Sequence, residues 1–361
     1  MKMREKTRRA ALLFAGMLLL GGCGRMAEIP DPDRLQVVCT TYPQYSYLQA
    51  IIGEVSDSVE LTLIMDDGTD LHSYQPVALD LVQIASADLL VYIGGESDTW
   101  VEDAAAEAVN PDMRMVSLVE LAGERAKEEE VVEGMQERRS LTGHDHGHEH
   151  GDEDDHAHED DHAHEDDHAH EDEAEKEIEY DEHVWLSLKN SIVFVNALAE
   201  QLEELDAAHA ENYRANADAY IAQLEELDRE YEEAVAGAGV RTLIFGDRFP
   251  FRYLTEDYGL DYYAAFPGCS AETEASFATV TFLAGKLDAL GIHSILVLEN
   301  SDQRVAETIR ENTASKDQQI MVLNSLQSVT TDELEAGATY LDGMRENLEV
   351  LKRALGSQDQ G

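Results

Sequence analysis

The chain of 361 residues has little positive charge, only three cysteines, and no apolar run long enough to span a bilayer. Lys and Arg number 26 against 76 Asp and Glu, so the formal net charge is −50. This imbalance argues against nucleic acids and anionic membrane surfaces as partners, and it suits a protein that handles cations. Outside residues 144–173 the sequence has no His-Glu-x-x-His, which argues against one large class of zinc hydrolases.

The N-terminal residues predict export. The first nine residues are rich in Lys and Arg, and residues 10–20 are small and apolar. That apolar run is too short for a transmembrane helix, which needs roughly 20 residues, and the pattern indicates a secretory signal. It ends in Leu-Gly-Gly-Cys, which resembles the lipobox of bacterial lipoproteins. The resemblance implies a signal at 1–22, lipid on Cys23, a tether at 23–34, and a location on the outer face of the cell membrane.

Beyond the tether, short apolar runs alternate with amphipathic helical patterns in two stretches of the chain. The runs that predict strands are 35–40, 61–65, 89–93, 113–118, 242–245, 262–266, 294–299 and 320–323. Apolar strands separated by helices are typical of parallel sheets covered on both faces. The sequence therefore predicts an α/β protein with two lobes, at 35–188 and 238–356, each with a mostly parallel sheet flanked by helices.

The segment 189–237 is expected to join the lobes through helices. Apolar residues recur at helical spacing from Tyr213 to Leu227 and the pattern continues to about Ala236. A helix of about 28 residues would be about 42 Å long at ~1.5 Å per residue. It could therefore run the height of both lobes as a stiff connector.

A histidine-rich and acidic segment, 144–173, interrupts the first lobe. It has almost no apolar residue larger than alanine, which predicts a disordered loop. Ten of the 14 histidines lie here: His144, His146, His148, His150, His156, His158, His162, His164, His168 and His170. Imidazoles spaced His-x-His in a flexible chain can close on one transition-metal ion. We expect an auxiliary metal-binding loop of low selectivity.

Four histidines remain outside this segment. His209 and His293 are expected to be structural or solvent-exposed. His72 lies in Gly-Thr-Asp-Leu-His-Ser-Tyr-Gln-Pro and His183 in Asp-Glu-His-Val-Trp-Leu. These segments resemble, in order, the first two metal-ligand motifs of the zinc- and manganese-binding proteins of ABC importers. That family also carries His-rich loops between the two motifs.

The resemblance covers essentially the whole mature chain, including the long connecting helix. It implies a monomeric solute-binding protein, with no catalytic activity, that holds a divalent metal between two lobes and delivers it to an ABC permease. Zinc (Zn²⁺) is the expected metal and manganese (Mn²⁺) the alternative. A surface metal buffer or adhesin is a second alternative, and a zinc hydrolase a third.

The sequence departs from the family at the third ligand, where the family has a histidine. This chain has Phe-Gly-Asp-Arg-Phe at 245–249. Arginine has no usable lone pair, so Asp247 becomes the candidate, or it caps the following helix instead. The fourth position in the family is an acid or a histidine, and Glu299 fits it. The weaker candidates are Asp302, Glu272 and Glu274. The implied metal site is therefore His72, His183, Asp247 and Glu299.

Two cysteines remain after lipidation is assigned to Cys23. Cys39 ends the predicted strand 35–40 and Cys269 follows the predicted strand 262–266, so both are expected near the crevice between the lobes. In an oxidising compartment a disulfide is plausible. The alternatives are two unrelated buried thiols or a soft metal ligand.

Overall fold

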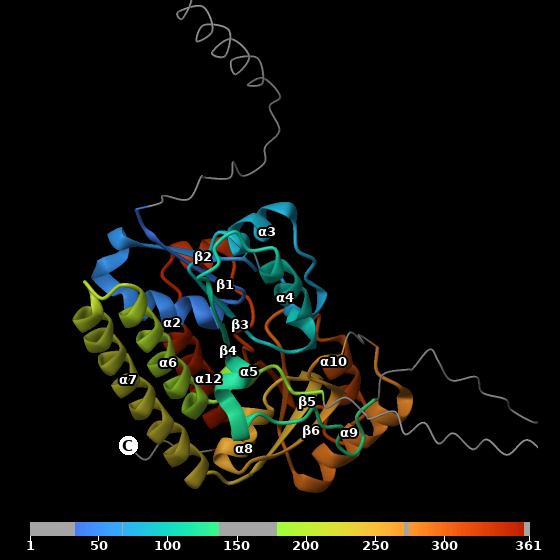
Figure 1. Ribbon diagram of the computed structural model, residues 1–361. Helices are drawn as coiled ribbons and strands as arrows, with labels where there is room; N and C mark the ends of the chain where they lie inside the picture. Colours follow the sequence, from blue (N-terminus) through green and yellow to red (C-terminus); the bar gives the residue numbers. More distant parts are fainter. Residues whose placement is uncertain (1–32, 67, 137–178, 271–273, 357–361) are drawn as a thin grey trace, which may run out of the picture.

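The computed structural model describes residues 33–66, 68–136, 179–270 and 274–356. Each lobe contains one sheet of four parallel strands (Figure 1). In the N-terminal lobe the order is β2-β1-β3-β4, with bounds β1 Leu35–Cys39, β2 Val59–Leu63, β3 Leu89–Tyr92 and β4 Arg114–Ser117. In the C-terminal lobe the order is β6-β5-β7-β8, with bounds β5 Thr242–Phe249, β6 Asp261–Pro267, β7 Ser294–Val297 and β8 Gln319–Val322. The predicted two-lobe α/β fold is confirmed.

Helices cover both sheets and connect them. Those of the N-terminal lobe are α2 Tyr42–Ile52, α3 Ala78–Ala85, α4 Thr99–Ala106 and α5 Leu118–Ala122. The connecting helices are α6 Leu188–Leu205 and α7 Ala210–Ala236, and α7 has the 27 residues of a stiff connector. The C-terminal lobe has α8 Arg252–Tyr258, α9 Phe277–Leu290, α10 Arg304–Glu311, α11 Thr331–Glu335 and α12 Tyr340–Ala354.

Two separate helices, α11 and α12, end the described part of the C-terminal lobe. Gly337 has a φ of 85°, a conformation that residues with a Cβ rarely adopt. Thr339 then caps α12, because its side chain accepts a hydrogen bond from the Asp342 N–H. The break allows α12 to start in a new direction.

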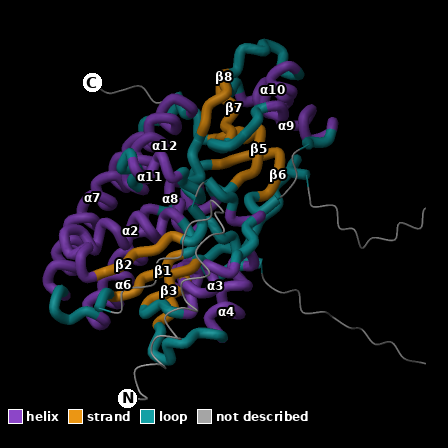
Figure 2. The backbone as a smooth tube through the Cα atoms, turned by 90° about the horizontal axis from the view of Figure 1, so that it is seen from above, coloured by secondary structure: helices purple, strands orange, loops and turns teal. Residues whose placement is uncertain are grey.

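Helix α12 crosses from the C-terminal lobe back to the N-terminal lobe. The Tyr340 N–H donates to Ser46 Oγ of α2 at 2.9 Å, and the Tyr340 hydroxyl donates to the Trp185 carbonyl at 2.6 Å. Figures 1 and 2 show α2, α6, α7 and α12 along the same side of the molecule. One hydrophobic core consequently includes Val37 of the first sheet and Phe245 of the second. The lobes thus share a core as well as a connecting helix.

A second crossing precedes the histidine-rich segment. Residues 126–136, which we call the strap, leave the N-terminal lobe and run along the C-terminal lobe. There the Gln136 N–H donates to the Ala265 carbonyl of β6 at 2.9 Å. The chain returns beside this strap, and the Glu129 N–H donates to the Glu179 carbonyl at 2.8 Å. Both ends of the segment between 136 and 179 therefore lie on the same side of the molecule.

Several predictions fall on residues outside the described ranges: the signal at 1–22, lipidation at Cys23, most of the tether, and the metal-binding loop 144–173. The lobe boundaries also stay predictions. Within the ranges that the structure describes, no helix combines the length and the apolar sequence needed to cross a bilayer.

Candidate metal centre

Two short turns bring His72 and His183 to the crevice between the lobes. His72 lies in the 3-10 turn Leu71–Ser73 that follows β2, and the Asp70 side chain starts this turn by accepting the His72 N–H at 2.9 Å. His183 precedes the turn Val184–Leu186, where the buried Trp185 indole donates to the Ser325 carbonyl at 2.8 Å. The carboxyl ends of parallel strands are where open α/β sheets gather ligands.

The two imidazoles face each other through their Nε2 atoms, which are 3.2 Å apart. Each Nδ1 has an oxygen at 2.9 Å: Ser97 Oγ for His72 and Asp181 Oδ1 for His183. A proton on each Nδ1 satisfies these contacts and makes each Nε2 a lone-pair donor. Zinc–nitrogen bonds of 2.0–2.1 Å at a tetrahedral angle place two nitrogens about 3.3 Å apart. The pair therefore has the spacing of two zinc ligands.

Cys269 is the third side chain of this cluster that could hold a metal ion. Its sulfur and one nitrogen of each histidine all lie within 4.8 Å of one another, and no carboxylate of the described residues joins the group. The close approach requires glycine at position 268. A Cβ there would lie 2.9 Å from the Phe249 carbonyl oxygen and 3.3 Å from His183 Cε1, so a larger residue would push the loop away.

Glu182 is a buried carboxylate beside the cluster, and Asp98 is a second buried carboxylate close enough to Glu182 for their charges to interact. Glu182 accepts the Ser97 N–H through Oε1 at 2.6 Å, while its Oε2 lies 3.6 Å from His72 Nδ1 and has no hydrogen-bond partner. Burial raises the pKa of Glu182, although its hydrogen bonds to Ser97 oppose the shift. Burial also raises the pKa of Asp98, to about 6. This concentration of acid groups favours a bound cation.

The structure does not bring Asp247 or Glu299 into the cluster. Strand β5 continues through Phe249 after a register shift between Phe245 and Arg248, so Asp247 lies within the strand rather than in a loop after it. Its carboxylate accepts the Arg248 N–H at 2.8 Å and the Leu298 N–H at 3.3 Å. Glu299 accepts the Ser325 N–H at 2.9 Å and hydroxyl at 2.6 Å. As ligands, both stay predictions.

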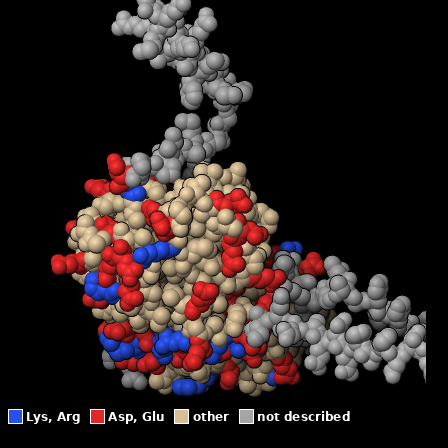
Figure 3. Space-filling model, in the orientation of Figure 1, with Lys and Arg blue, Asp and Glu red and all other residues tan. Residues whose placement is uncertain are grey.

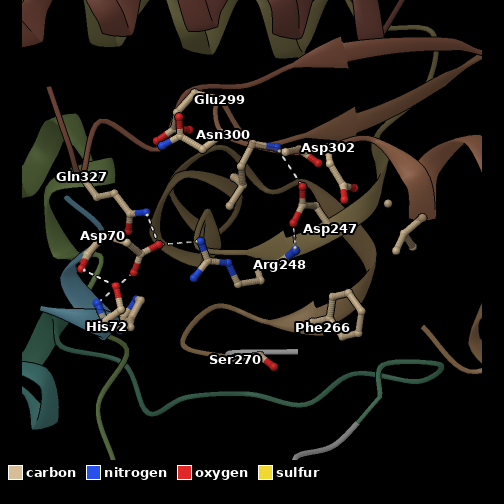
Figure 4. A pocket seen from close by; sticks show the side chains of 15 residues that line it. Asp70, His72, Asp247, Arg248, Phe266, Ser270, Glu299, Asn300, Asp302 and Gln327 are labelled. Carbon is tan, nitrogen blue, oxygen red and sulfur yellow. Dashed lines mark hydrogen bonds and ion pairs between the residues drawn. The ribbon is translucent and has the colours of Figure 1, made fainter. Parts of the chain in front are cut away.

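The two positions that could replace the missing family histidine have other packing roles. A Cβ on Gly246 would lie 2.7 Å from the Cα of Ala306 in α10, so a side chain there would displace that helix. Arg248 donates to Asp70 Oδ2 at 2.8 Å (Figure 4). Burial alone would raise the pKa of Asp70, but the hydrogen bond and charge of Arg248 hold it below the ordinary value. Arg248 is therefore an interlobe ion-pair residue.

Two cavities border the cluster. The larger, of about 390 Å³, lies between the lobes and includes His72, Asp247, Arg248 and Glu299 among its walls. Figure 4 shows Asp247, Glu299 and Asp302 away from His72, whereas Asp70 lies beside it. The smaller, of about 260 Å³, is lined by His72, Ser97, Glu182 and Cys269, together with Glu96, Glu179 and Tyr180. Glu179 and Tyr180, the first described residues after the histidine-rich segment, thus form part of the cavity wall beside the cluster.

The predicted disulfide between Cys39 and Cys269 is wrong for this structure, in which neither residue is bridged. Cys39 is fully buried in β1, and its thiol points to the Thr62 carbonyl at 3.4 Å. Cys269 instead lies beside the two histidines. The strand order places Cys39 inside the N-terminal sheet, whereas a disulfide with Cys269 would require Cys39 to lie at the crevice.

The other two described histidines are apart from the cluster, as expected. His209 precedes α7 and contacts Asp206 at 2.7 Å, and His293 is exposed. Sequence reasoning missed Asp181 and Ser97 as hydrogen-bond partners of the two imidazole rings. Asp181 belongs to the motif that identified His183, so its role could have been predicted. Ser97 is far from either motif in the sequence and only the fold places it at His72.

The fold, the histidine pair and the two motifs can be compared with known proteins. A family described as zinc-uptake complex component A, periplasmic, matches residues 37–354. The chain belongs to this family. Its described residues also carry many acidic side chains over the face drawn in Figure 3, in keeping with the cation-handling role predicted from composition.

Individual relatives agree with this assignment. The zinc-binding protein AdcA of Streptococcus pyogenes is 31% identical over 325 residues, covering 90% of this chain and 57% of the relative. The high-affinity zinc uptake system protein ZnuA of Bacillus subtilis is 28% identical over 348 residues and covers 95% and 96%. The Zn(II)-bound ZnuA-like domain of Streptococcus pneumoniae AdcA has a TM-score of 0.63 at 25% identity, covering 89% and 99%. The chain spans a little over half of the AdcA protein that it matches.

Proposed function

We propose that this protein is the zinc-binding component of an ABC importer, which captures zinc outside the cell membrane and delivers it to the permease. The observation that carries the proposal is the pair of Nε2 atoms of His72 and His183, 3.2 Å apart in the interlobe crevice. The names of the AdcA and ZnuA relatives support zinc as the cargo. Lipid on Cys23 would hold the protein at the outer face of the membrane.

The chemistry required is binding and release without catalysis. His72 and His183 supply two neutral nitrogens, and their Nδ1 contacts with Ser97 and Asp181 fix the rings before the ion arrives. Asp247 and Glu299 remain proposed carboxylate ligands, which would have to give up their present hydrogen bonds to reach the ion. The histidine-rich segment 144–173 would gather ions, and the wall position of Glu179 and Tyr180 supports transfer into the smaller cavity.

Competition titration against a chromophoric chelator tests this function. We expect one tight zinc site in the full chain, weaker sites from the histidine-rich segment, and weaker binding of manganese. His72→Ala and His183→Ala should each abolish the tight site, whereas His293→Ala is the matched control because that histidine is exposed. Deleting 144–173 should leave the tight site intact. If this deletion removed all tight binding, the protein would be a metal buffer and the importer role would be lost.

A further inference from the structure

We propose that Cys269 is a zinc ligand, so that the site is built from two imidazoles and a thiolate in place of the family's third histidine. The inference deepens the proposed function and rests on zinc binding at His72 and His183. It concerns a residue to which the sequence motifs gave no part in the metal site.

The first argument is geometric. Cys269 comes from the loop after β6, yet its sulfur lies in one group with the nitrogens of His72 and His183, all within 4.8 Å. Zinc with bonds of about 2.05 Å to nitrogen and 2.3 Å to sulfur would place them about 3.6 Å apart at a tetrahedral angle. Only a small contraction of the group is therefore needed to close it on an ion.

The second argument is that the loop is positioned from three directions. Gly268 has no Cβ that would strike Phe249 or His183, and the Cys269 N–H donates to Glu129 Oε1 of the strap at 3.2 Å. Burial, together with the charges of nearby carboxylates, raises the pKa of the Cys269 thiol, and a hydrogen bond from the Glu182 backbone opposes this shift. Such a hydrogen bond stabilises negative charge on sulfur, which a coordinated thiolate carries.

The third argument is charge balance. Glu182 is 2% exposed, and its Oε2 has no hydrogen-bond partner beside the same small cavity. A buried carboxylate whose second oxygen accepts no hydrogen bond is costly unless a cation compensates its charge. On zinc binding the Cys269 S–H bond breaks, its proton goes to solvent, and a Zn–S bond forms. Two neutral rings, one thiolate and the Glu182 carboxylate then offset the two charges of zinc.

The chemical consequence concerns metal choice. Thiolate is a soft ligand that zinc accepts readily, whereas manganese prefers oxygen. A site with Cys269 should therefore discriminate against manganese more strongly than the same site without sulfur. The arginine that occupies a position of the family's third histidine is compatible with this arrangement, because it pairs with Asp70 instead of facing the ion.

Cobalt substitution tests the proposal because a bound thiolate gives a sulfur-to-cobalt charge-transfer absorption in the near ultraviolet. The full chain is loaded with one equivalent of Co²⁺ and compared with Cys269→Ser, Cys269→Ala, Cys39→Ala and His183→Ala. Ser preserves the size of the side chain, so it separates ligation from packing. Cys39→Ala is the matched control, since Cys39 is the other cysteine of the described chain and lies inside β1. Circular dichroism checks that each variant folds.

We expect the charge-transfer band in the wild type and in Cys39→Ala, and its loss in both Cys269 variants. Zinc affinity should fall by at least about 100-fold in Cys269→Ser, more than the loss of an outer hydrogen-bond partner usually causes, and the preference for zinc over manganese should narrow. A wild-type protein that binds cobalt without the band would overturn the cysteine proposal. If His183→Ala lost tight binding while Cys269→Ser kept it, the proposed function would stand and the ligand assignment would fall. If neither variant changed affinity, both would fall.

Discussion

Arg248 of the C-terminal lobe donates a hydrogen bond of 2.8 Å to Asp70 of the N-terminal lobe. Asp70 lies two residues before His72 in the sequence. The Gln327 side-chain amide donates to the same carboxylate oxygen at 3.1 Å. The Asp70 carboxylate also accepts a hydrogen bond from the His72 backbone N–H and so stabilises the 3-10 turn that contains His72. The Asp70 carboxylate thus connects Arg248, which takes a position of the family's third histidine, to His72 across the crevice.

Replacing this arginine should loosen the crevice without removing a ligand. Arg248→Met keeps the length of the side chain but leaves Asp70 with weaker partners. Since both side chains are about three-quarters shielded, we expect a loss of about 1–2 kcal/mol in the free energy of unfolding, measured by urea denaturation. Arg304→Met removes an ion pair to Asp302 that is largely exposed and should change stability far less, because solvent screens exposed pairs. Equal effects from the two variants would mean that the interlobe ion pair stabilises the folded protein no more than an exposed ion pair does.

The carboxylate behind His183 should tune zinc affinity. Asp181→Asn preserves the shape of the contact to Nδ1 but removes the negative charge that makes the ring a better donor. We expect zinc affinity to fall by roughly 10–100-fold, measured by chelator competition. The chain offers a close control in Asp206→Asn, which alters the same kind of contact at His209. Affinity should be unchanged there, and an equal loss in both variants would contradict the assignment.

Asp98 should make the folded state less stable as pH rises. Its pKa is raised by burial from 3.8 to about 6, so between these values the folded chain binds more protons at this group than the unfolded chain. The free energy of unfolding should therefore fall through this window, by about 3 kcal/mol at most from a shift of about two units. Asp98→Asn should remove this part of the slope, as shown by denaturation at pH 4, 5, 6 and 7. An unchanged slope would contradict the raised pKa.

Two glycines should respond to alanine with opposite signs. Gly246→Ala forces a Cβ to 2.7 Å from the Ala306 backbone, and such overpacking typically costs 1–3 kcal/mol. Gly285 lies inside α9, where an added Cβ would meet nothing within 4 Å, so alanine there should stabilise the protein by about 0.5–1 kcal/mol. Thermal unfolding of both variants measures the difference. A tolerated Gly246→Ala would reopen that position as a site for the family's histidine.

The elements that local sequence specifies were predicted well. The apolar run 89–93 became β3, and the stripe that begins at Tyr213 became α7, because burial on both sides and helical spacing are properties of neighbouring residues. The end of β5 was not predictable in this way. Polar residues at 246–248 resemble a loop, but the pairing of Phe249 with Pro267 keeps them in the strand.

The candidate site likewise combines residues that local sequence identifies with one that only the fold places there. His72 and His183 each lie in a motif that carries its own turn, so sequence alone identifies both. Cys269 is brought to them from the other lobe by the position of β6, by Gly268 and by the strap at Glu129. These contacts come from three distant parts of the chain. The predicted strands placed Cys269 near the crevice, but only the fold could decide whether it faced Cys39 or the histidines.

The return of α12 to the N-terminal lobe has a consequence for biosynthesis. Tyr340 fills a place against Ser46 and Trp185, so the first lobe lacks part of its own core until residue 340 has been synthesised. Domains usually fold in order during synthesis, but here the first lobe must wait for a helix that follows the second sheet. The proposed export of an unfolded chain suits such an architecture, because the core of the first lobe is complete only once Tyr340 is on the far side of the membrane.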